Sequence, residues 1–457
     1  MQKKYDIGVH VFTRDLRLED NTTLMKVLKL SKQVIPIFIF NPEQVTNKNE
    51  YRSNNCIQFM CECLDELNTK LKLKGSKLFI YYGDPIKIIK SLKKLNRHIG
   101  CIGMNRDYTP FATKREADIN NLCGDLEMDF ICEEDYLLNG CNDIKNGSGN
   151  PYVKFTPYFR TAVKIQISKV QKNTYSNYIS NRNKFMEEYD GYHKLYKFNE
   201  NINVHGGRNN AIKILMHIAN HNRYNDERDT PSIDTTKLSA YIKFNVVSIR
   251  EVYHVFKLKL SKSNKLIQQL YWRDFYTTIV YHYPHVIGHN MNNHKIKWLY
   301  SKTKFDRWKE GMTGVPLVDA GMRQLNATGY MHNRVRMLVG NFLVKILHID
   351  WRQGEKYFAQ HLVDHDVSLN NMNWQWVAST GTDSQPYFRY FNPWTQSMKF
   401  DNKCEYIKKW IPELKNVAND HIHKWNVEWK NNREINYPKP IVDDIGKQIE
   451  ITLKLYS

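Results

Sequence analysis

The stretch IGVHVF at residues 7–12 is a short apolar run rich in β-branched side chains, and it is the first of five such runs. The other four are Val34–Phe40, Leu78–Tyr82, Cys101–Met104 and Phe130–Cys132. Longer amphipathic stretches such as Asn54–Leu73 and Thr113–Leu122 lie between them. Alternation of strand and helix patterns is typical of a parallel sheet covered on both faces. The sequence therefore predicts a doubly wound α/β domain over residues 1–135.

The pattern changes in the middle of the chain. Residues 136–223 contain many turn formers, as in NGCNDIKNGSGNP at 139–151, and we interpret them as an interdomain linker. From about Thr235 onward helical periodicity dominates. Turns are expected at Tyr283–Pro284, Gly311–Gly314 and Asn392–Pro393. Because 457 residues are too many for one compact core, a second, largely α-helical domain is predicted over 224–457.

The chain is strongly basic, with 67 Lys and Arg against 47 Asp and Glu and a formal net charge of +20. Such a charge suits a polyanionic partner, because cationic side chains that neutralise phosphates release condensed counterions. A composition rich in Lys and Asn throughout would raise the charge without such a partner. Charge alone therefore favours DNA only modestly.

The sequence also bears on the compartment. No apolar run approaches the roughly 20 residues that a membrane-spanning helix needs. The N-terminal apolar run is broken by Arg14, Asp15 and Arg17 and has no small-residue cleavage site. Seven of the eight cysteines precede residue 142, and they suggest neither a disulfide framework nor a metal site. We expect a protein with reduced thiols that is not secreted and works in the cytoplasm or nucleus.

Eight motifs follow one another along the chain. They are VFTRDLRLEDNTTL, FTPYFR, RDTPSIDTTKLSAYI, YWRDFY, WKEGMTGVPLVDAGMRQLNATGYMHNRVRM, IDWRQGEKYF, NNMNWQWVASTGTDSQPYFRYFNPWTQSMKFD and YPKPIVDD. In this order they resemble motifs of the photolyase/cryptochrome family, and most of all those of class I cyclobutane pyrimidine dimer photolyases. One short motif would be weak, but eight in register are specific. The resemblance implies an N-terminal α/β domain joined to a helical domain that binds FAD, which agrees with the patterns above.

Hydroxyl groups near the start of the helical region are candidates for binding the FAD phosphates. Thr235, Thr236 and Ser239 lie within five residues at a predicted helix start, where backbone N–H groups also favour anions. Simple capping of the helix would explain them equally well. The resemblance places phosphate contacts here and adds Tyr224 and Arg228. The loop between Arg228 and Thr235 is one residue shorter than in some relatives.

The segment LVDHDVSLNN contributes the next candidates. Asp364 and Asp366 are carboxylates that would need a partner if buried, and Arg336 is the partner we expect. The resemblance implies that Arg336 and Asp364 flank the isoalloxazine ring and that Asp366 contacts the flavin ring or ribose. A pair of carboxylates on a helix surface is the ordinary alternative.

Asn370 is the most diagnostic residue of the segment, because the resemblance places it near flavin N5. A side-chain amide can accept a hydrogen bond from protonated N5 and donate one when N5 has no proton. Repair enzymes of the family have Asn at this position, whereas many light-signalling cryptochromes have Asp or Cys. Asn370 therefore favours DNA repair over signalling, although an amide that caps a turn is the general alternative.

A lesion pocket is expected on two helices. Gln269, Trp272, Arg273 and Tyr276 share one face of the first, and Asn333, Arg336 and Met337 share a face of the second. The resemblance implies that Trp272 and Trp376 bracket a flipped-out dimer and that Asn333 and Met337 line its floor. An aromatic pocket recovers by stacking the cost of extruding a poorly stacked lesion. A second hydrophobic core is the alternative.

The type of damage follows from Asn333 and Met337. Enzymes that repair the (6-4) photoproduct carry histidines at both positions, because that reaction needs a proton donor. This chain has neither, and dimer splitting needs only an electron. His332 beside them belongs to a motif common to dimer enzymes and is interpreted as structural. Gln269 is a departure, since dimer-specific relatives usually have Glu there, and it leaves (6-4) repair open.

Tryptophans and arginines complete the predicted machinery. Trp298, Trp351 and Trp374 match the family's electron-transfer chain from solvent to flavin, although three core tryptophans would be the plain alternative. Such a chain also serves cryptochromes. Arg334 and Arg389 resemble contacts to DNA phosphates, which position a protein without reading sequence. Each could instead belong to a solvated basic face.

Taken together, these residues predict a monomeric photolyase that splits cyclobutane pyrimidine dimers in UV-damaged DNA with light and reduced FAD. Asn370, Gln269, Asn333 and Met337 form its predicted catalytic set. A cryptochrome photoreceptor, a (6-4) photolyase and a catalytically silent flavoprotein are the alternatives. A second, antenna chromophore is expected in the N-terminal domain, but NRDYTPF at 105–111 does not choose among a folate, a deazaflavin and a flavin.

Overall fold

The structure is a computed structural model that describes residues 3–292 and 294–456. The chain forms two compact units. Unit 1 consists of Met1–Phe198, Val204–Asn220 and Leu238–Pro284, and unit 2 of Asn199–Asn203, His221–Lys237 and His285–Ser457. These units group the segments differently from the predicted ranges 1–135, 136–223 and 224–457. The domain ranges stay a prediction, and the two units are described separately below.

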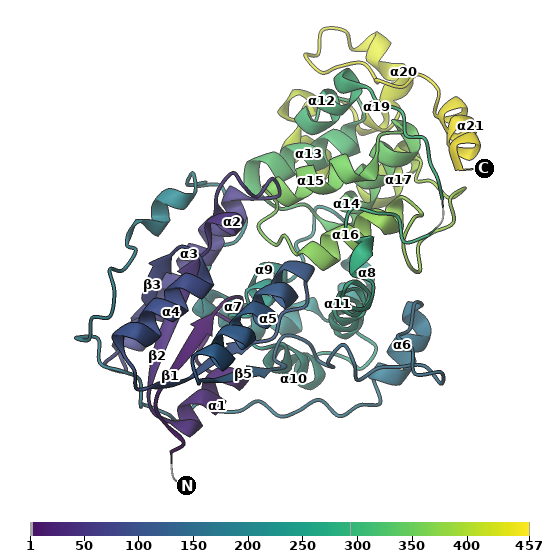
Figure 1. The fold of residues 1–457 in the computed structure, drawn as a ribbon. Coiled ribbons are helices and arrows are strands. Elements are labelled where there is room, and N and C mark those ends of the chain that lie inside the picture. The colour runs from purple at the N-terminus through teal and green to yellow at the C-terminus, as the bar shows by residue number, and fades with distance from the viewer. Residues whose placement is uncertain (1–2, 293, 457) are drawn as a thin grey trace. The chain divides into compact units, whose positions relative to one another are not determined.

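The described part of unit 1 is built on a five-stranded parallel sheet (Figure 1). Its strands are β1 (Tyr5–Phe12), β2 (Ser31–Phe40), β3 (Phe79–Tyr82), β4 (Ile99–Asn105) and β5 (Asp129–Glu133). Their order is β3-β2-β1-β4-β5, so the direction of winding reverses between β1 and β4. The five predicted runs are all strands, and the predicted doubly wound α/β fold is confirmed.

Helices connect these strands. They are α1 (Thr22–Leu30), α2 (Pro42–Val45), α3 (Asn54–Lys72), α4 (Pro85–Leu95) and α5 (Pro110–Asp125). Two glycines let α1 approach the sheet closely, because a Cβ atom at Gly8 or at Gly103 would collide with the side chain of Val27. α4 begins at a Pro in its first turn, and Asp84 accepts hydrogen bonds from the N–H groups of Ile86 and Lys87.

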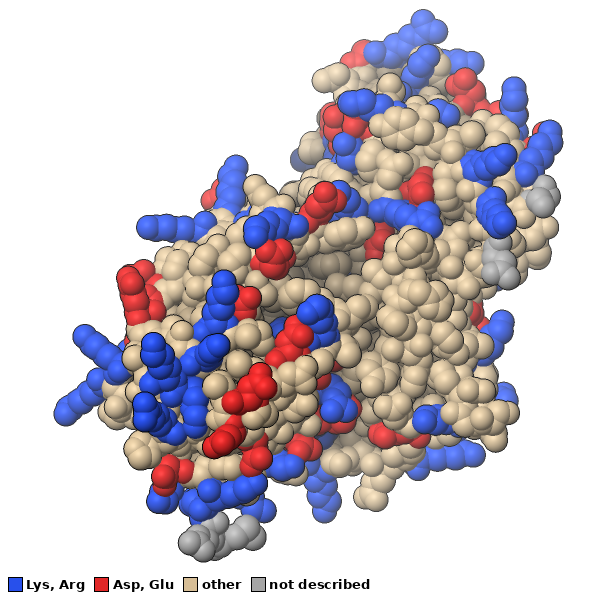
Figure 2. All heavy atoms as spheres, in the orientation of Figure 1, with Lys and Arg blue, Asp and Glu red and all other residues tan. Residues whose placement is uncertain are grey.

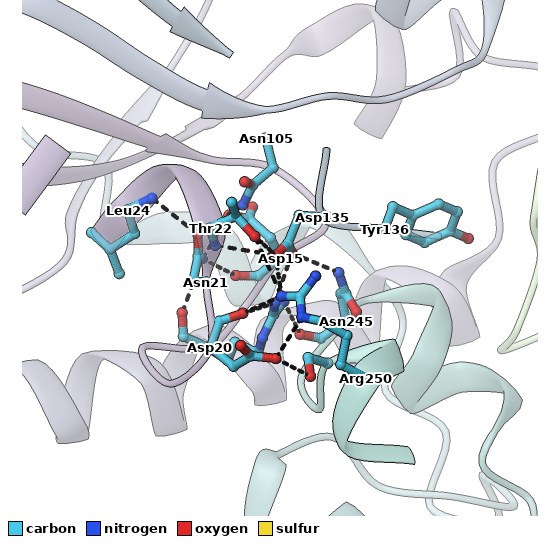
Figure 3. A network of polar contacts seen from close by, with 12 residues as sticks. Asp15, Asp20, Asn21, Thr22, Leu24, Asn105, Asp135, Tyr136, Asn245 and Arg250 are labelled. Atoms are coloured by element: carbon cyan, nitrogen blue, oxygen red, sulfur yellow. Dashed lines mark hydrogen bonds and ion pairs between the residues drawn. The ribbon is translucent and has the colours of Figure 1, made fainter. Parts of the chain in front are cut away.

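A buried polar network lies where the carboxyl ends of β1, β4 and β5 meet (Figure 3). Asp15 accepts hydrogen bonds from Asn21 (2.8 Å) and Asn105 (2.7 Å). Two arginines pair with Asp135: Arg17 at 2.7 Å and Arg250 at 2.8 Å. Arg250 comes from a helix far along the chain, so the network joins that helix to the edge of the sheet. The buried carboxylate of Asp135 is thus paired with two cations, and that of Asp15 is satisfied by hydrogen bonds.

The remaining helices of unit 1 follow the sheet in the sequence. The α-helices among them are α6 (Phe155–Ala162), α7 (Arg208–Met216), α9 (Ser239–Lys243), α10 (Ile249–Lys259) and α11 (Lys265–His282), and η1 (Gly191–Leu195) is a 3₁₀ turn. α10 starts with a capping box, in which Ser248 and Glu251 bond each other's backbone N–H groups. α6 packs against α11, so the FTPYFR motif of the predicted linker is helical and packed.

Unit 2 is helical, as predicted for this part of the chain. Its helices and turns are η3 (Pro284–Val286), α8 (Tyr224–Glu227), α12 (Lys302–Glu310), α13 (Pro316–Thr328), α14 (Asn333–Asn341), α15 (Trp351–His361), α16 (Val367–Val377), α17 (Pro393–Phe400), α18 (Glu405–Trp410), α19 (Asn419–His423), α20 (Trp425–Glu428) and α21 (Ile445–Tyr456). η2 (Ile218–His221) precedes α8, a π-helical turn, η4 (Phe342–Ile346), extends α14, and the 3₁₀ turns η5 (Pro412–Leu414) and η6 (Trp429–Asn431) follow α18 and α20. The predicted turn at Asn392–Pro393 is the start of α17, where Asn392 caps the helix. A core of aliphatic and aromatic side chains holds these helices together.

Three general findings concern the chemistry of the chain. All eight cysteines are free thiols. Within residues 3–292 and 294–456, no cluster of three or more His, Cys, Asp or Glu side chains is arranged to hold a metal ion. In the same described residues, helices that combine the length and the apolar character of a membrane span are absent.

Candidate functional site

Helices α14 and α16 of unit 2 pack against each other and carry most of the candidate residues. Asn333, Arg334, Arg336 and Met337 lie on α14, and Asn370, Trp374 and Trp376 lie on α16. Unit 2 also contains the candidates Thr235, Thr236, Tyr224, Arg228, Asp364, Asp366, Trp298, Trp351 and Arg389. Gln269, Trp272 and Ser239 belong to unit 1.

The expected ion pair between Arg336 and Asp364 is present. Arg336 Nη2 lies 3.2 Å from Asp364 Oδ1 and 3.1 Å from Oδ2, and its Nε donates to the carbonyl oxygen of Met331 at 2.7 Å. The Asp364 side chain is almost fully buried, whereas that of Arg336 keeps a quarter of its surface exposed. The carboxylate therefore fixes the guanidinium, which leaves part of a positive group available to an anionic ligand.

Asn370 has its amide oriented by the backbone. Its Nδ2 donates to the carbonyl oxygen of Glu355 at 2.9 Å, while its Oδ1 accepts from none of the residues that the structure describes. Beside it, Asn371 Nδ2 donates to Glu355 Oε1 at 3.1 Å. Burial raises the pKa of the Glu355 carboxyl to about 7. Asn370 thus presents a free acceptor oxygen from a nearly buried position.

Asp366 is the N-cap residue of α16. It precedes α16, and its carboxylate accepts the backbone N–H of Leu369 at 3.1 Å. A carboxylate at this end of a helix is favoured by the helix dipole. This position fixes Asp366 one helical turn before Asn370. Its predicted contact to the flavin ring or ribose stays a prediction.

The residues predicted to bind the FAD phosphates lie on separate segments and make separate contacts. Thr235 is half-buried, and its hydroxyl lies 3.2 Å from that of Tyr330. The guanidinium of Arg228 lies 5.4 Å from the ring centre of Tyr224 in a cation–π contact. Ser239 begins α9, and this helix has no side-chain cap. The N-cap residue of α9 is Leu238, so none of the three hydroxyl residues stands at the cap position of this helix.

His332 leaves one buried nitrogen without a partner. It caps α14 through Nδ1, which accepts the N–H of Arg334 at 3.2 Å. Because Nδ1 accepts, the proton of the neutral ring lies on Nε2, and this donor is buried with no hydrogen-bond partner among the described residues. Burial lowers the pKa of His332 to about 4, so the ring is neutral at pH 7. A buried donor of this kind needs an acceptor that a water or a ligand can supply.

The two predicted floor residues of the lesion pocket touch each other. Asn333 Nδ2 lies 3.7 Å from the sulfur of Met337, one turn along α14. Asn333 is exposed and Met337 half-buried. Trp376 is half-buried, and its buried part packs against the hydrophobic core of unit 2. These side chains present an amide, a thioether and an indole, none of which titrates near neutral pH.

On α11 of unit 1, only part of the predicted face is accessible. Arg273 and Tyr276 are buried, and the Arg273 guanidinium lies 3.4 Å from the ring centre of Tyr136. Gln269 and Trp272 are half-exposed. The Gln269 amide bonds to none of the described residues, and the Trp272 indole stacks on Phe155 with 3.5 Å between ring centres. Gln269 and Trp272 are thus the accessible pair.

The three predicted electron-transfer tryptophans differ in burial. Trp374 and Trp351 are buried, and Trp298 is half-exposed in the segment before α12. Trp351 Nε1 donates to Asn290 Oδ1 at 3.0 Å, and Trp298 meets the ring of Tyr456 edge to face at 5.9 Å. Of the three, only Trp298 reaches solvent, and the path itself stays a prediction.

The two predicted phosphate contacts have different surroundings. Arg334 is paired with Asp229, with 2.7 Å between Nη2 and Oδ1, so its charge is partly compensated. Arg389 is exposed, in a loop with the exposed rings of Tyr387, Phe388 and Tyr390. On the face that Figure 2 shows, Lys and Arg side chains are spread over much of the surface with Asp and Glu among them.

Several contacting residues were missed by sequence reasoning. Phe155 covers one face of Trp272, and Trp308 lies 6.3 Å from Trp374 between ring centres. Lys345 is fully buried inside the apolar run FLVKI. The only signal in the sequence was that lone charge within an apolar run. Nothing local indicated the other two contacts.

Comparisons with known proteins now identify the family. A family model described as the FAD binding domain of DNA photolyase matches residues 266–456, and one described as DNA photolyase matches residues 8–174. Deoxyribodipyrimidine photo-lyase of Halobacterium salinarum is 32% identical over 90% of this chain and 89% of its own. That of Escherichia coli is 30% identical over 98% of this chain and 97% of its own. The chain belongs to the DNA photolyase family.

Solved structures of photolyases and a cryptochrome share this fold. A photolyase from Sulfolobus tokodaii, solved with two FAD molecules, has a TM-score of 0.88 and 37% identity, over 98% of this chain and 99% of its own. A class III photolyase from Agrobacterium tumefaciens has a TM-score of 0.91 and 28% identity, over 100% and 98% of the two chains. A cryptochrome from Synechocystis has a TM-score of 0.89 and 26% identity, over 99% and 100%.

This photolyase-family enzyme carries the family's FAD-binding domain, so FAD is its cofactor. The side chains of unit 2 fit that group. The guanidinium of Arg336, with a quarter of its side chain exposed, and the Asn370 oxygen, which none of the described residues uses, suit an anionic ring with a protonated nitrogen.

Proposed function

We propose that this protein is a deoxyribodipyrimidine photolyase that splits cyclobutane pyrimidine dimers in UV-damaged DNA. The observation that carries the proposal is the orientation of Asn370, whose amide nitrogen is held by the Glu355 carbonyl. This arrangement turns an acceptor oxygen outward, as a reduced flavin with a protonated N5 needs. The names of the similar curated proteins support the same activity.

The protein's own groups account for the binding of the cofactor in its reactive form. FAD, when bound and reduced, supplies the light-driven electron that opens the dimer and takes it back. Arg336 balances negative charge on the ring, and Asp364 holds its guanidinium in place. Asn370 Oδ1 would accept a hydrogen bond from the protonated N5 of the reduced ring. Thr235, Thr236, Ser239, Tyr224, Arg228 and Asp366 are proposed as further cofactor contacts.

The chemistry around the lesion favours the cyclobutane dimer over the (6-4) photoproduct. Asn333 and Met337 contain no group that titrates near neutral pH. Burial lowers the pKa of His332 to about 4, so at pH 7 this neighbouring ring carries no acidic proton for an active-site acid. Dimer splitting needs an electron and no acid, which matches these side chains.

DNA binding is proposed for groups of both units. Trp272 and Trp376 would each stack on the extruded bases, and Gln269 would bond their edges. Arg389 would contact the DNA phosphates, and its exposed aromatic neighbours would fill the space that the extruded dimer leaves in the duplex. Arg334 would exchange its partner Asp229 for a phosphate. Trp298, Trp351 and Trp374 are proposed to reduce the cofactor under light.

A cryptochrome-type photoreceptor is the second candidate. The similarity to the Synechocystis cryptochrome favours it, and so does Gln269, which lacks the negative charge usual in dimer-specific enzymes. The Asn370 side chain speaks against it. We also propose that the protein is a monomer, that it works where the cell keeps its DNA, and that it binds a second chromophore.

The test is a repair assay on the FAD-loaded, reduced protein. A duplex with one cyclobutane thymine dimer and a duplex with one (6-4) photoproduct are each mixed with protein and given blue light or darkness. Light-dependent loss of the cyclobutane dimer supports the proposal. Loss of the (6-4) photoproduct alone would replace it with the alternative lesion, and loss of neither would support the photoreceptor.

Asn370→Leu provides the matching variant. It removes the acceptor, so we expect repair to fall by roughly tenfold or more, in line with the loss of a hydrogen bond to a charged group. Asn373→Leu is the control, because Asn373 is exposed on the same helix and donates to the Leu369 carbonyl. Equal repair by both variants would remove Asn370 from the mechanism.

A further inference from the structure

Lys345 is a fully buried lysine in the π-helical turn η4. The other side chains of this turn, FLVKI, are apolar. Among the described residues, no carboxylate lies within ion-pair distance of its ammonium. Burial lowers the pKa of this lysine to about 7, and an apolar side chain of similar length would pack here at lower cost. Stability alone does not explain why a lysine stands at this position.

The ammonium makes three contacts, all within unit 2. Lys345 Nζ donates to Ser379 Oγ at 2.9 Å and to the carbonyl oxygen of Tyr387 at 3.0 Å. It also lies 4.1 Å from the ring centre of Tyr456. Ser379 has a φ of 58°, a left-handed conformation that is unfavourable for a serine. The lysine therefore bonds one strained residue and the backbone of a second segment.

That second segment is the loop at 386–390, whose sequence is PYFRY. Tyr387, Phe388 and Tyr390 are 37%, 61% and 38% exposed, and Arg389 between them is exposed as well. Three exposed rings around an exposed cation form a surface suited to bases and phosphates. Such a surface has to be held in shape if its side chains are to meet DNA without a large loss of entropy.

Tyr387 is held at both its backbone and its ring. Lys345 bonds its carbonyl, and the Tyr387 ring stacks on Tyr456 with 5.8 Å between centres and an angle of 8°. Tyr456 is itself fixed, because its hydroxyl donates to the carbonyl of Ala378 at 2.5 Å. Beyond Tyr387, the side chains of Phe388 and Arg389 point to solvent. The base of the loop is held by these contacts, and the side chains of its tip are exposed.

We infer that Lys345 is a positioning residue for DNA binding, which acts by fixing Tyr387 and so the loop that carries Arg389. This inference rests on the proposed function of the protein. Lys345 does not touch the DNA or the cofactor in this role. A purely structural lysine would instead be expected to affect folding of unit 2 and nothing specific to DNA.

The test is Lys345→Met, which keeps the length of the side chain and removes the amine that donates both hydrogen bonds. We expect thermal stability and FAD content to be equal to or above those of the wild type, while affinity for dimer-containing duplex falls about three- to tenfold. Amide hydrogen exchange of residues 387–390 should accelerate. Lys415→Met is the charge control, since Lys415 is exposed on another part of unit 2. Its effect on affinity should be small.

A double-mutant cycle with Arg389→Ala separates the two explanations. If Lys345 works through the loop, the losses of affinity are not additive. Additive losses, or wild-type affinity in Lys345→Met, would overturn the inference. Should Lys345→Met fail to bind FAD, Ser379→Ala removes one of the two hydrogen bonds and should reproduce a smaller loss of affinity, whereas wild-type affinity there would also overturn it. The wild-type protein tests the proposed function separately, because its failure to bind the lesion would refute that function whatever Lys345 does.

Discussion

The ring of Phe155 lies flat against the indole of Trp272, with 3.5 Å between ring centres and an angle of 8° between planes. Phe155 is buried at the start of α6, and Trp272 is half-exposed on α11. An indole has two faces, and this stack covers one of them. A base that stacks on Trp272 therefore has one face to use, and it meets an indole that is already held in place.

Phe155→Leu tests this arrangement. Loss of the supporting ring should let Trp272 reorient, so we expect affinity for dimer-containing DNA to fall about three- to tenfold, because base–aromatic stacking contributes roughly 1–3 kcal/mol. Phe159→Leu is the control, since Phe159 stacks on the same Phe155 without being placed against Trp272. Fluorescence anisotropy with damaged and undamaged duplexes gives the measurement. Equal losses in both variants would mean that Phe155 only stabilises α6.

Gln269→Glu examines the one departure from the dimer-specific pattern. Glutamate is a stronger acceptor for donors on the lesion and repels undamaged backbone phosphates. We expect the ratio of affinities for damaged and undamaged duplex to rise about threefold or more. Gln268→Glu adds the same charge at the neighbouring, half-buried position and should leave the ratio unchanged. A ratio that stays at the wild-type value in Gln269→Glu would show that the amide performs as well as the carboxylate.

The sequence allowed more of the fold than of the site to be predicted. β2 and β4 were evident because buried parallel strands read as continuous apolar runs. The Arg336–Asp364 pair was expected because a buried carboxylate needs a cation. The stack of Phe155 on Trp272 was not, since it joins distant segments and only tertiary packing creates it. The orientation of the Asn370 amide could not be predicted either. Its partner is the backbone carbonyl of Glu355, and every residue type has such a group.

Gly354→Ala should disturb the inner tryptophan. A Cβ atom at Gly354 would lie 2.5 Å from Trp374 Cζ3 and 2.6 Å from Leu343 Cδ2, so the indole has to move. Overpacking of this kind costs about 1–3 kcal/mol. We expect light-driven reduction of oxidised FAD to slow, while repair by chemically reduced protein is affected less. Gly124→Ala on α5 is the control, because its Cβ would meet nothing within 4 Å.

Transient absorption after blue excitation measures the light-driven reduction of oxidised FAD, and the repair assay measures dimer splitting by the chemically reduced protein. The outcome that contradicts this role of Trp374 is an unchanged reduction rate in a Gly354→Ala protein whose indole has demonstrably shifted. A loss of both activities in equal proportion would instead indicate that the pocket as a whole is distorted. The Gly124→Ala protein should match the wild type in both assays and can gain slightly in stability, since Ala favours helix.

Glu355 makes stability depend on pH. Burial raises the pKa of its carboxyl from 4.5 to about 7, so the folded protein keeps this proton over a range in which the unfolded chain has released it. The folded state binds more protons between about pH 4.5 and pH 7, so stability falls as the pH rises through that window and the loss is complete above it. The contribution is at most about 3 kcal/mol.

Glu355→Gln removes this effect and keeps an oxygen that Asn371 can bond. The melting temperature of the variant relative to that of the wild type should therefore rise from pH 5 to pH 8. Glu450→Gln, at an exposed position on α21, should show no such change. A wild-type-to-variant difference that does not depend on pH would mean that Glu355 is ionised throughout, and then Asn370 and Asn371 would be ordered around a buried negative charge beside the cofactor.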